Sequence, residues 1–178
     1  MMIDLQPTFL EDGLTKLLPL NENDFERLFA VASDPAIWEQ HPSSDRYKKE
    51  VFKLYFEGAV KSGSAFLIFE KMSGDLIGST RYYNYQENTS SIAIGYTFLA
   101  KKYWGGIYNR SVKQLLIDYA FQSVNTIFLH IGASNIRSQK AAQNIGAIKV
   151  NEIDFESLGK STPHYEYEIK KENWQRIR

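Results

Sequence analysis

The sequence contains no cysteine among its 178 residues. This absence excludes disulfide bonds, cysteine-ligated zinc or iron–sulfur sites and a cysteine nucleophile. The formal net charge is +0, because 21 Lys and Arg residues balance 21 Asp and Glu residues. The chain therefore lacks the basic character of a nucleic-acid-binding protein. The most apolar run, residues 92–100, is far too short to cross a bilayer. We expect neither a nucleic-acid partner nor a membrane partner.

A secretory signal is also missing from the first residues. Residues 1–7 contain no basic segment followed by an apolar core, so a cytoplasmic location is expected. A length of 178 residues with 43% hydrophobic content suits one domain with a sizeable core. We see no internal repeat, linker or low-complexity segment, and we expect residues 1–178 to form a single domain.

Residues 92–121 combine a strand, a glycine turn and a helix. Apolar residues alternate with smaller ones at residues 92–98, which is typical of a partly buried strand. Gly105 and Gly106 follow in a turn, and residues 109–121 then carry apolar side chains at the helical period. The first turn of a helix presents unpaired N–H groups and a partial positive charge. This arrangement predicts an anion-binding site at the start of the helix.

The charges around this turn sharpen the prediction. No acidic residue occurs from residue 88 to residue 117, whereas four basic residues do: Lys101, Lys102, Arg110 and Lys113. A cation at a helix start is disfavoured by the helix dipole, so Arg110 is easier to understand beside a bound anion. The alternative is that the glycines only turn the chain and the basic side chains are solvated. The local pattern leaves both interpretations open.

The order of the expected elements indicates a mixed α/β fold. Short strands at residues 8–19 and 65–85 form hairpins around glycine turns, and helices are expected near residues 23–32 and 47–60. The strand–helix–strand crossover over residues 92–131 favours parallel pairing of its two strands. A short helix over residues 135–144 precedes a closing pair of strands within residues 148–169. One mixed sheet flanked by helices is the economical architecture.

Three blocks of the sequence together resemble GNAT-type N-acetyltransferases. They are LTKLLPLNENDFERLF, then IGYTFLAKKYWGGIYNRSVKQLLIDYAF, then NIRSQKAAQNIGA. Within that family the chain is similar to the branch of ribosomal-protein alanine acetyltransferases. The resemblance implies a mostly antiparallel sheet of about seven strands, splayed around strands four and five and flanked by about four helices. It also implies direct acetyl transfer from acetyl-CoA, as co-substrate, to a primary amine of a protein N-terminus or a small molecule. No metal is expected, and a homodimer is left open.

The resemblance also implies which residues hold acetyl-CoA. The family's phosphate-loop pattern is Gln or Arg, two residues, Gly, one residue, then Gly or Ala. Lys102 takes its first position and Gly105 its second, but Ile107 stands where the last small residue belongs. Backbone groups at the end of the preceding strand are implied to hold pantetheine. The expected cofactor-binding residues are Thr97, Phe98, Leu99, Lys102, Gly105, Gly106, Ile107, Tyr108, Asn109, Arg110, Ser111, Asn135 and Ser138.

The family's catalytic positions are altered. The usual carboxylate base corresponds to Ala93, and the usual thiol-protonating tyrosine corresponds to Ala142. Substitutes are therefore sought in Tyr83 and Glu87, at the end of the third strand of the family, and in His41, which titrates near neutral pH. With both usual groups lost, we expect no single side chain to be indispensable as a base.

Each substitute also has a purely structural interpretation. A strand tyrosine is commonly a packing residue, a turn glutamate is commonly solvated, and a lone loop histidine is commonly structural. His130 is interpreted as a hydrogen-bonded core histidine. A non-catalytic acyl-CoA-binding sensor with the same fold therefore remains the alternative function.

Overall fold

The computed structural model describes residues 3–157 and 160–177 of the chain. Its centre is one eight-stranded sheet in the order β1-β2-β3-β4-β5-β6-β8-β7. The strands are β1 (Leu10–Glu11), β2 (Thr15–Pro19), β3 (Ala65–Glu70), β4 (Leu76–Gln86), β5 (Ser91–Leu99), β6 (Thr126–Gly132), β7 (Ile148–Ser157) and β8 (Lys160–Lys170).

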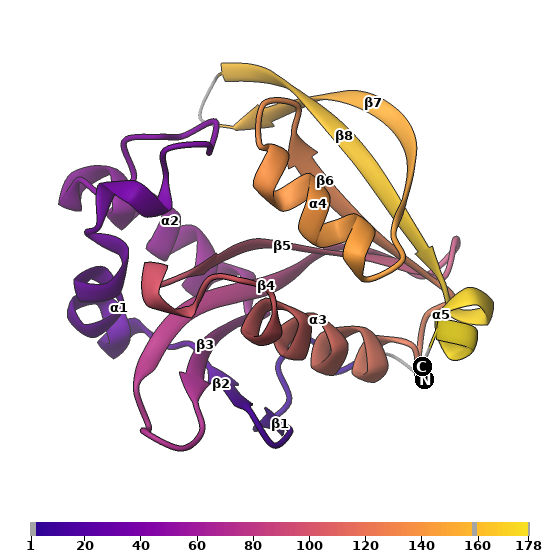
Figure 1. The fold of residues 1–178 in the computed structure, drawn as a ribbon, viewed down its shortest axis with the longest axis horizontal. Helices are drawn as coiled ribbons and strands as arrows, with labels where there is room; N and C mark the ends of the chain where they lie inside the picture. Colours follow the sequence, from indigo (N-terminus) through magenta and orange to yellow (C-terminus); the bar gives the residue numbers. More distant parts are fainter. Residues whose placement is uncertain (1–2, 158–159, 178) are drawn as a thin grey trace.

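Helices cover the sheet, and short 3₁₀ turns lead into several of them (Figure 1). The helices are α1 (Phe25–Ala32), α2 (Lys49–Ser62), α3 (Ile107–Ala120), α4 (Ile136–Asn144) and α5 (Lys171–Ile177), with 3₁₀ segments η1 (Glu22–Asp24), η2 (Pro35–Ile37) and η3 (Lys101–Tyr103). Among the described residues, no helix is long and apolar enough to span a membrane.

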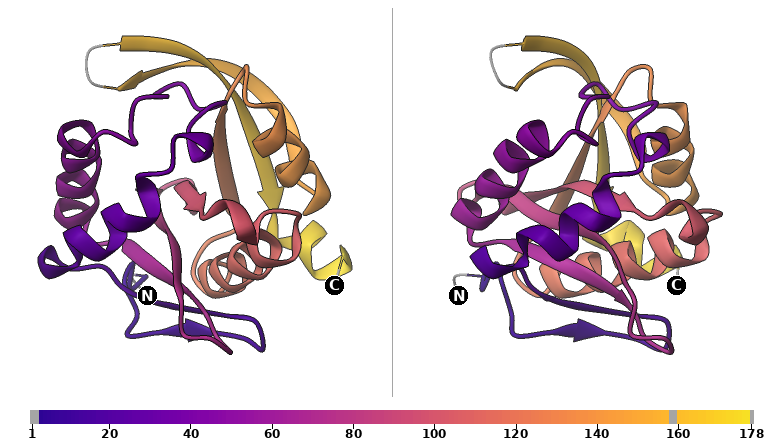
Figure 2. Two further views of the ribbon diagram at one scale, coloured as in Figure 1. Left: turned by 60° about the vertical axis from the view of Figure 1, so that its left-hand side comes forward. Right: turned by 90° about the vertical axis from the view of Figure 1, so that its left-hand side faces the viewer.

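The two faces of the sheet bury different side chains, as the period of two along a strand requires. In β3, Phe66 and Ile68 join the core beneath α3, whereas Ala65 and Leu67 join the core beneath α1 and α2. Figure 2 shows α1 and α2 on one side of these strands and α3 on the other. β3 is therefore apolar at nearly every position, because both of its faces are covered.

The sheet opens between β5 and β6. These two strands are parallel, as the crossover predicts, and pair only at Ser91–Thr126, Ile92–Ile127 and Ala93–Phe128. Beyond these pairs, β6 and β8 rise away from β5 (Figure 1). β5 also changes course at Tyr96, which has φ of 53° and lies where the β4–β5 register shifts. A positive φ at a tyrosine is a strained backbone that marks a bulge.

The expected fold class is confirmed, with differences in number and order. The described residues form eight strands rather than about seven, because Leu10–Glu11 adds a short first strand. The splay expected around strands four and five therefore falls between β5 and β6. Five α-helices are present rather than about four, since the sequence interpretation missed α5.

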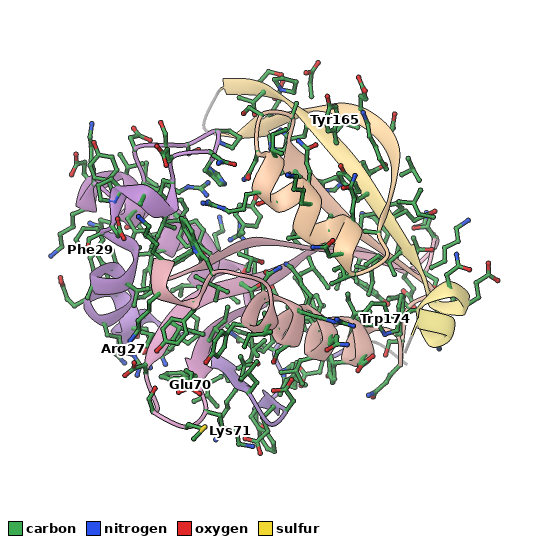
Figure 3. The ribbon with its side chains drawn as sticks, in the orientation of Figure 1. Arg27, Phe29, Glu70, Lys71, Tyr165 and Trp174 are labelled. Carbon is green, nitrogen blue, oxygen red and sulfur yellow. The ribbon has the colours of Figure 1, made fainter. Side chains whose placement is uncertain are left out.

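α5 is fixed by one tryptophan. Trp174 is 5% exposed and belongs to the core beneath α3. Its indole Nε1 donates a hydrogen bond of 2.7 Å to Oδ1 of Asp118 on α3. Figure 3 labels Trp174 at this junction. A seven-residue helix carries too little periodic pattern to be predicted, so its docking depends on this long-range contact.

Candidate active site

A groove of about 650 Å³ runs between the end of β5, the start of α3 and the helix α4. Seven residues after the β5 bulge form its β5–α3 side: Thr97, Phe98, Leu99, Tyr103, Trp104, Gly105 and Gly106. α3 adds Ile107, Asn109 and Arg110, and the facing wall includes Asn135, Arg137, Ser138, Lys140 and Asn144. Ten of the thirteen expected cofactor-binding residues thus line one groove, with Lys102, Tyr108 and Ser111 outside it.

The start of α3 presents backbone to this groove. Gly105 and Gly106 have φ of 105° and 112°, a conformation that favours glycine. A Cβ atom built on either residue meets nothing within 4 Å, so backbone is open to an approaching ligand. In the described chain, no side chain caps α3 at Gly106 and no acid lies in its first turn. The free N–H groups and Arg110 at this point suit a phosphate.

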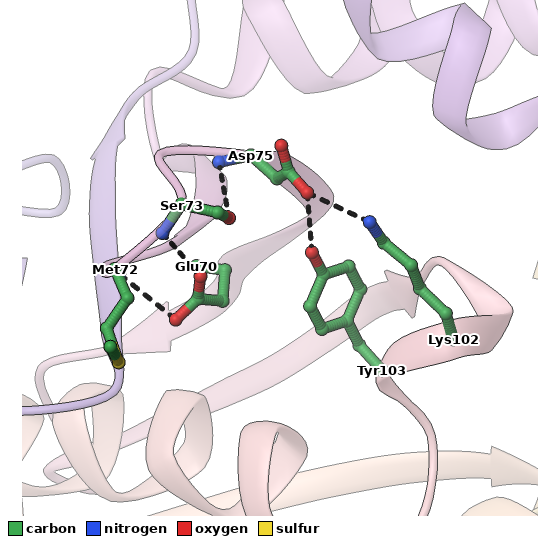
Figure 4. Close-up of polar contacts among 6 residues, drawn as sticks. All are labelled: Glu70, Met72, Ser73, Asp75, Lys102 and Tyr103. Carbon is green, nitrogen blue, oxygen red and sulfur yellow. Dashed lines mark hydrogen bonds and ion pairs between the residues drawn. The ribbon is translucent and has the colours of Figure 1, made fainter.

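Lys102 is engaged elsewhere (Figure 4). Its ammonium lies 2.9 Å from Oδ2 of Asp75, in the turn between β3 and β4, and the hydroxyl of Tyr103 donates to the same oxygen at 2.8 Å. The hydrogen bond to Asp75 raises the pKa of Lys102. The side chain of Lys102 is 67% exposed. This lysine therefore fixes the turn before α3 and stands apart from the groove.

Tyr108 and Ser111 also point away. The Tyr108 ring packs edge-on against Tyr103 at a centroid distance of 5.0 Å. Ser111 is buried and donates a hydrogen bond of 2.6 Å to Oδ2 of Asp12 in the β1–β2 turn. Both side chains hold α3 on the sheet.

The groove residues that the sequence interpretation did not assign to the cofactor include Trp104, Arg137 and Lys140. The guanidinium of Arg137 lies 3.9 Å from the centre of the Trp104 ring and donates to the carbonyl of Ile37 at 3.2 Å. Lys140, one turn further along α4, adds a second cation. The sequence did not predict Arg137 and Lys140 as groove residues, because they line the groove only once α4 is docked beside β5. The sole sequence signal was their spacing of three residues on one helix face.

A smaller cavity of about 120 Å³ adjoins the groove inside the splay. The two share seven lining residues: His41, Thr97, Asn109, Asn135, Ser138, Ala141 and Ile145. The inner cavity is completed by β5, β6, α3 and α4, through residues that include Gly95, Tyr96, Lys113, His130 and Ala142. A ligand arm entering along Thr97 thus reaches this cavity from the groove.

His130 lies at the inner cavity in a chain of three side chains. The hydroxyl of Tyr83 on β4 lies 2.7 Å from Nδ1 of His130, and Nε2 of His130 lies 2.8 Å from Oε2 of Glu166 on β8. An ionised carboxylate only accepts, so Nε2 carries the ring proton and Nδ1 accepts from Tyr83. The side chain of His130 is 8% exposed and that of Glu166 is 22% exposed. Burial raises the pKa of Tyr83 well above its usual value.

Tyr83 lies next to Ala93, the residue that stands where the family usually carries its carboxylate. Tyr83 is paired directly with Ala93 across the β4–β5 ladder, and directly paired residues project to the same face. A Cβ atom on Gly95, two residues further along β5, would come within 2.8 Å of the Tyr83 ring. The small residues Ala93 and Gly95 therefore leave room for a tyrosine next to the position of the family's carboxylate.

The two other catalytic candidates lie differently. His41 lines both cavities. Its Nδ1 accepts from the backbone N–H of Ser43 at 2.9 Å, and its Nε2 lies 3.2 Å from Nη1 of Arg46. Burial, and then the charge of Arg46, lower the pKa of His41 to about 3, which makes it a weak base. Glu87 is exposed in the turn after β4 and lines neither cavity.

A comparison with protein-family models identifies the family of the chain. A model described as an acetyltransferase (GNAT) domain matches residues 15–148. The chain belongs to the GNAT acetyltransferase family. The family resemblance of the sequence is thereby confirmed. Membership implies acetyl transfer that depends on acetyl-CoA.

Solved structures agree on the GNAT fold. A GCN5-related N-acetyltransferase from Brucella melitensis has a TM-score of 0.82 at 18% identity, over 95% of this chain and 81% of that chain. RimJ from Mycobacterium smegmatis, in complex with CoA-disulfide, has a TM-score of 0.74 at 17% identity, over 97% and 91%. Spermidine N-acetyltransferase from Vibrio cholerae, in complex with CoA and spermine, has a TM-score of 0.70 at 14% identity, over 92% and 99%. No curated protein matches the sequence.

Proposed function

We propose that residues 1–178 form one N-acetyltransferase domain, which moves an acetyl group from acetyl-CoA directly to a primary amine. The observation that carries this proposal is the continuity of the two cavities. The groove begins at the open start of α3 and leads along Thr97 into the inner cavity, which His130 lines. The hydroxyl of Tyr83, the cross-strand partner of Ala93, is hydrogen-bonded to that histidine. This site thus offers a proton acceptor beside Ala93, the position at which the family usually carries a carboxylate.

The groove accounts for binding of the co-substrate. Free N–H groups from Gly105 onwards, together with Arg110, are placed to hold the pyrophosphate. Arg137 and Lys140 add positive charge on the facing wall, and Trp104 supplies an apolar surface. The backbone of β5 at residues 97–99 is placed to hold the pantetheine arm. Holding both reactants in the splay supplies a large part of the rate.

The chain of Tyr83, His130 and Glu166 accounts for removal of the amine proton. The neutral amine nitrogen attacks the thioester carbon, and the C–N bond forms. The nitrogen then gives a proton to the Tyr83 oxygen, while Tyr83 passes its own proton to Nδ1 of His130. Glu166 stabilises the imidazolium that results, because an adjacent carboxylate favours the charged ring. Release of that proton to water restores the site.

The cavities favour an acceptor with few positive charges. Among the residues that the structure describes, no carboxylate lines either cavity, so a polycation would find little neutralising charge there. The rings of Tyr83 and Phe155 approach each other at a centroid distance of 6.5 Å, and those of Phe155 and His164 at 5.0 Å. Of these three aromatic side chains, His164 lines the inner cavity. A protein N-terminus or a small monoamine fits this surface better than a polyamine.

A thiol-release assay over a panel of amines tests the proposal. The panel includes peptides with different N-terminal residues, amino acids, polyamines and aminoglycosides. Acetyl-CoA consumption that depends on one of these classes supports the enzyme. Calorimetric binding of CoA with no release of thiol from any acceptor would favour the non-catalytic acyl-CoA sensor. Absence of CoA binding would contradict both functions.

A further inference from the structure

Lys113 points from the second turn of α3 into the inner cavity. It is 7% exposed, and its ammonium donates a hydrogen bond of 2.7 Å to Oγ1 of Thr97 on β5. The Thr97 hydroxyl lies 2.8 Å from that of Thr80 on β4. One lysine side chain therefore reaches through the helix–sheet interface to the place where the groove meets the inner cavity.

This lysine has no counter-charge in the described part of the chain. The other titratable groups at its cavity are His41 from the loop before α2, Tyr96 from β5, His130 from β6 and His164 from β8. None of these groups is acidic, and none of the ion pairs found among the described residues includes Lys113. Burial alone lowers its pKa to about 7.

Burying an amine without a counter-charge destabilises the folded protein, so its presence here indicates a functional role. Core packing at this position would be better served by an apolar side chain of similar length, because a buried charge or an unsatisfied amine is penalised. Thr97 satisfies only one of the three ammonium donors. Lys113 lines the inner cavity, into which the proposed function brings the reacting end of the thioester. The site thus contains a proton donor and lacks the anion that would match it.

The residue at position 142 indicates that this anion is the thiolate of CoA. Ala142 on α4 lines the same cavity as Lys113, and it stands where GNAT enzymes usually carry the tyrosine that protonates the thiol. We propose that the ammonium of Lys113 protonates the CoA thiolate as it leaves, in place of that tyrosine. This assignment rests on the proposed acetyl transfer and deepens it.

In this scheme Lys113 gives a proton to the leaving sulfur, and Tyr83 takes a proton from the acceptor amine. When the tetrahedral intermediate collapses, the C–S bond breaks and its electron pair goes to sulfur. One proton moves from Nζ of Lys113 to sulfur, which gives free CoA thiol and a neutral amine. Lys113 takes a proton from water, while the proton of the acceptor leaves through Tyr83 and His130. The net reaction consumes an amine and acetyl-CoA and yields an amide and CoA.

The first experiment needs no acceptor. CoA is bound to the wild type and to Lys113→Met, and the bound thiol is titrated by its thiolate absorbance against a dethio-CoA blank. A cation close to sulfur should lower the thiol pKa by about 1 to 3 units in the wild type. In Lys113→Met this lowering should vanish. Equal thiol pKa values in two proteins that both bind CoA would overturn the proposal. Failure of the wild type to bind CoA would instead contradict the proposed function.

A second variant separates proton donation from charge alone. Lys113→Arg keeps the positive charge, but a guanidinium does not release its proton in proteins. We expect its bound thiol to keep the lowered pKa while kcat falls by about 10²-fold or more, as loss of a general acid predicts. A kcat equal to that of the wild type would show that charge suffices, and would overturn proton donation. This comparison remains decisive if Lys113→Met fails to fold.

Discussion

The hydroxyl of Tyr83 lies 2.7 Å from Nδ1 of His130, and Tyr83 is also the cross-strand partner of Ala93. These two relationships place a hydrogen-bonded tyrosine–histidine pair beside the position from which the family's base is missing. Tyr83 was predicted as a substitute from the sequence. His130 was interpreted as a hydrogen-bonded core histidine, and its burial and its bonds to Tyr83 and Glu166 agree with that interpretation. Its part in accepting a proton belongs to the proposed function.

Replacing Tyr83 with Phe should reduce kcat/KM strongly. The change removes the oxygen that meets the amine and leaves the ring packing on Gly95 in place. We expect a loss of about 10²–10⁴-fold, the usual contribution of general base catalysis, with the Kd for CoA unchanged. Steady-state kinetics provide the measurement, with an acceptor found in the thiol-release assay.

Two matched variants accompany Tyr83→Phe. Glu166→Gln should lower kcat less, because it weakens the support of His130 without removing the proton acceptor. Glu87→Gln should leave kcat/KM unaltered, since Glu87 is exposed in the turn after β4 and the hydrogen bonds of the cavity-lining His130 go to Tyr83 and Glu166 instead. If Tyr83→Phe kept the kcat/KM of the wild type, the expectation from the sequence would stand: no single side chain would be indispensable as a base.

Gly105→Val should abolish CoA binding. The φ of 105° disfavours any residue with a Cβ atom, and a branched side chain would occupy the space where phosphate must approach the backbone. Gly74→Val is the control. Its φ of 74° imposes comparable strain, and it too has nothing within 4 Å of a built Cβ atom, but it lies in the β3–β4 turn. Calorimetry should detect CoA binding in Gly74→Val only, and binding in both would place the phosphates elsewhere.

Much of the fold follows from local pattern. The alternation along β5, the glycine turn and the periodic helix predicted the crossover and its parallel pairing, because each depends on neighbours in the sequence. The insertion of β8 between β6 and β7 did not follow from the sequence. That order depends on pairing between β6 and β8, whose residues are far apart in the chain and carry no local mark of their partner.

The site divides in the same way. Two adjacent glycines before a helix are typical of a turn with positive φ, so the turn at Gly105 and Gly106 could be predicted. Lys113 could not be placed, since a lysine in a helix is ordinarily solvated. Its burial depends on how α3 docks on β5, where Thr97 follows the bulge at Tyr96. Lys102 shows the converse, because a lysine at the family's loop position is paired with Asp75 in the β3–β4 turn.

Arg110→Gln should weaken CoA binding and reduce its dependence on salt. Arg110 lines the groove at the start of α3, where the proposed function puts the phosphates of CoA. Lys102→Gln is the matched control, because it removes one positive charge from the same loop but from a side chain held by Asp75. Calorimetry with CoA and dephospho-CoA at several salt concentrations should show a smaller effect for Lys102→Gln. The reverse ranking would assign the phosphate contact to Lys102.

Lys113 should make the stability of the protein depend on pH in the absence of any ligand. Its pKa is about 7 in the folded chain against an ordinary value of 10.5. Between these two values the unfolded chain holds a proton that the folded chain lacks, so the free energy of unfolding increases as pH rises. Below pH 7 both states hold the proton, and the cost of the buried charge is present in full.

The test compares wild type with Lys113→Met by urea denaturation at about pH 7, 8 and 9. The wild type should gain stability relative to the variant by up to about 1.4 kcal/mol per pH unit, the value for one proton. Taking the difference between the two proteins removes the contribution of every other titrating group. Parallel profiles would mean that the amine of Lys113 keeps its ordinary pKa and is hydrated in solution. That result would remove the physical basis for a lysine tuned to exchange a proton with sulfur near neutral pH.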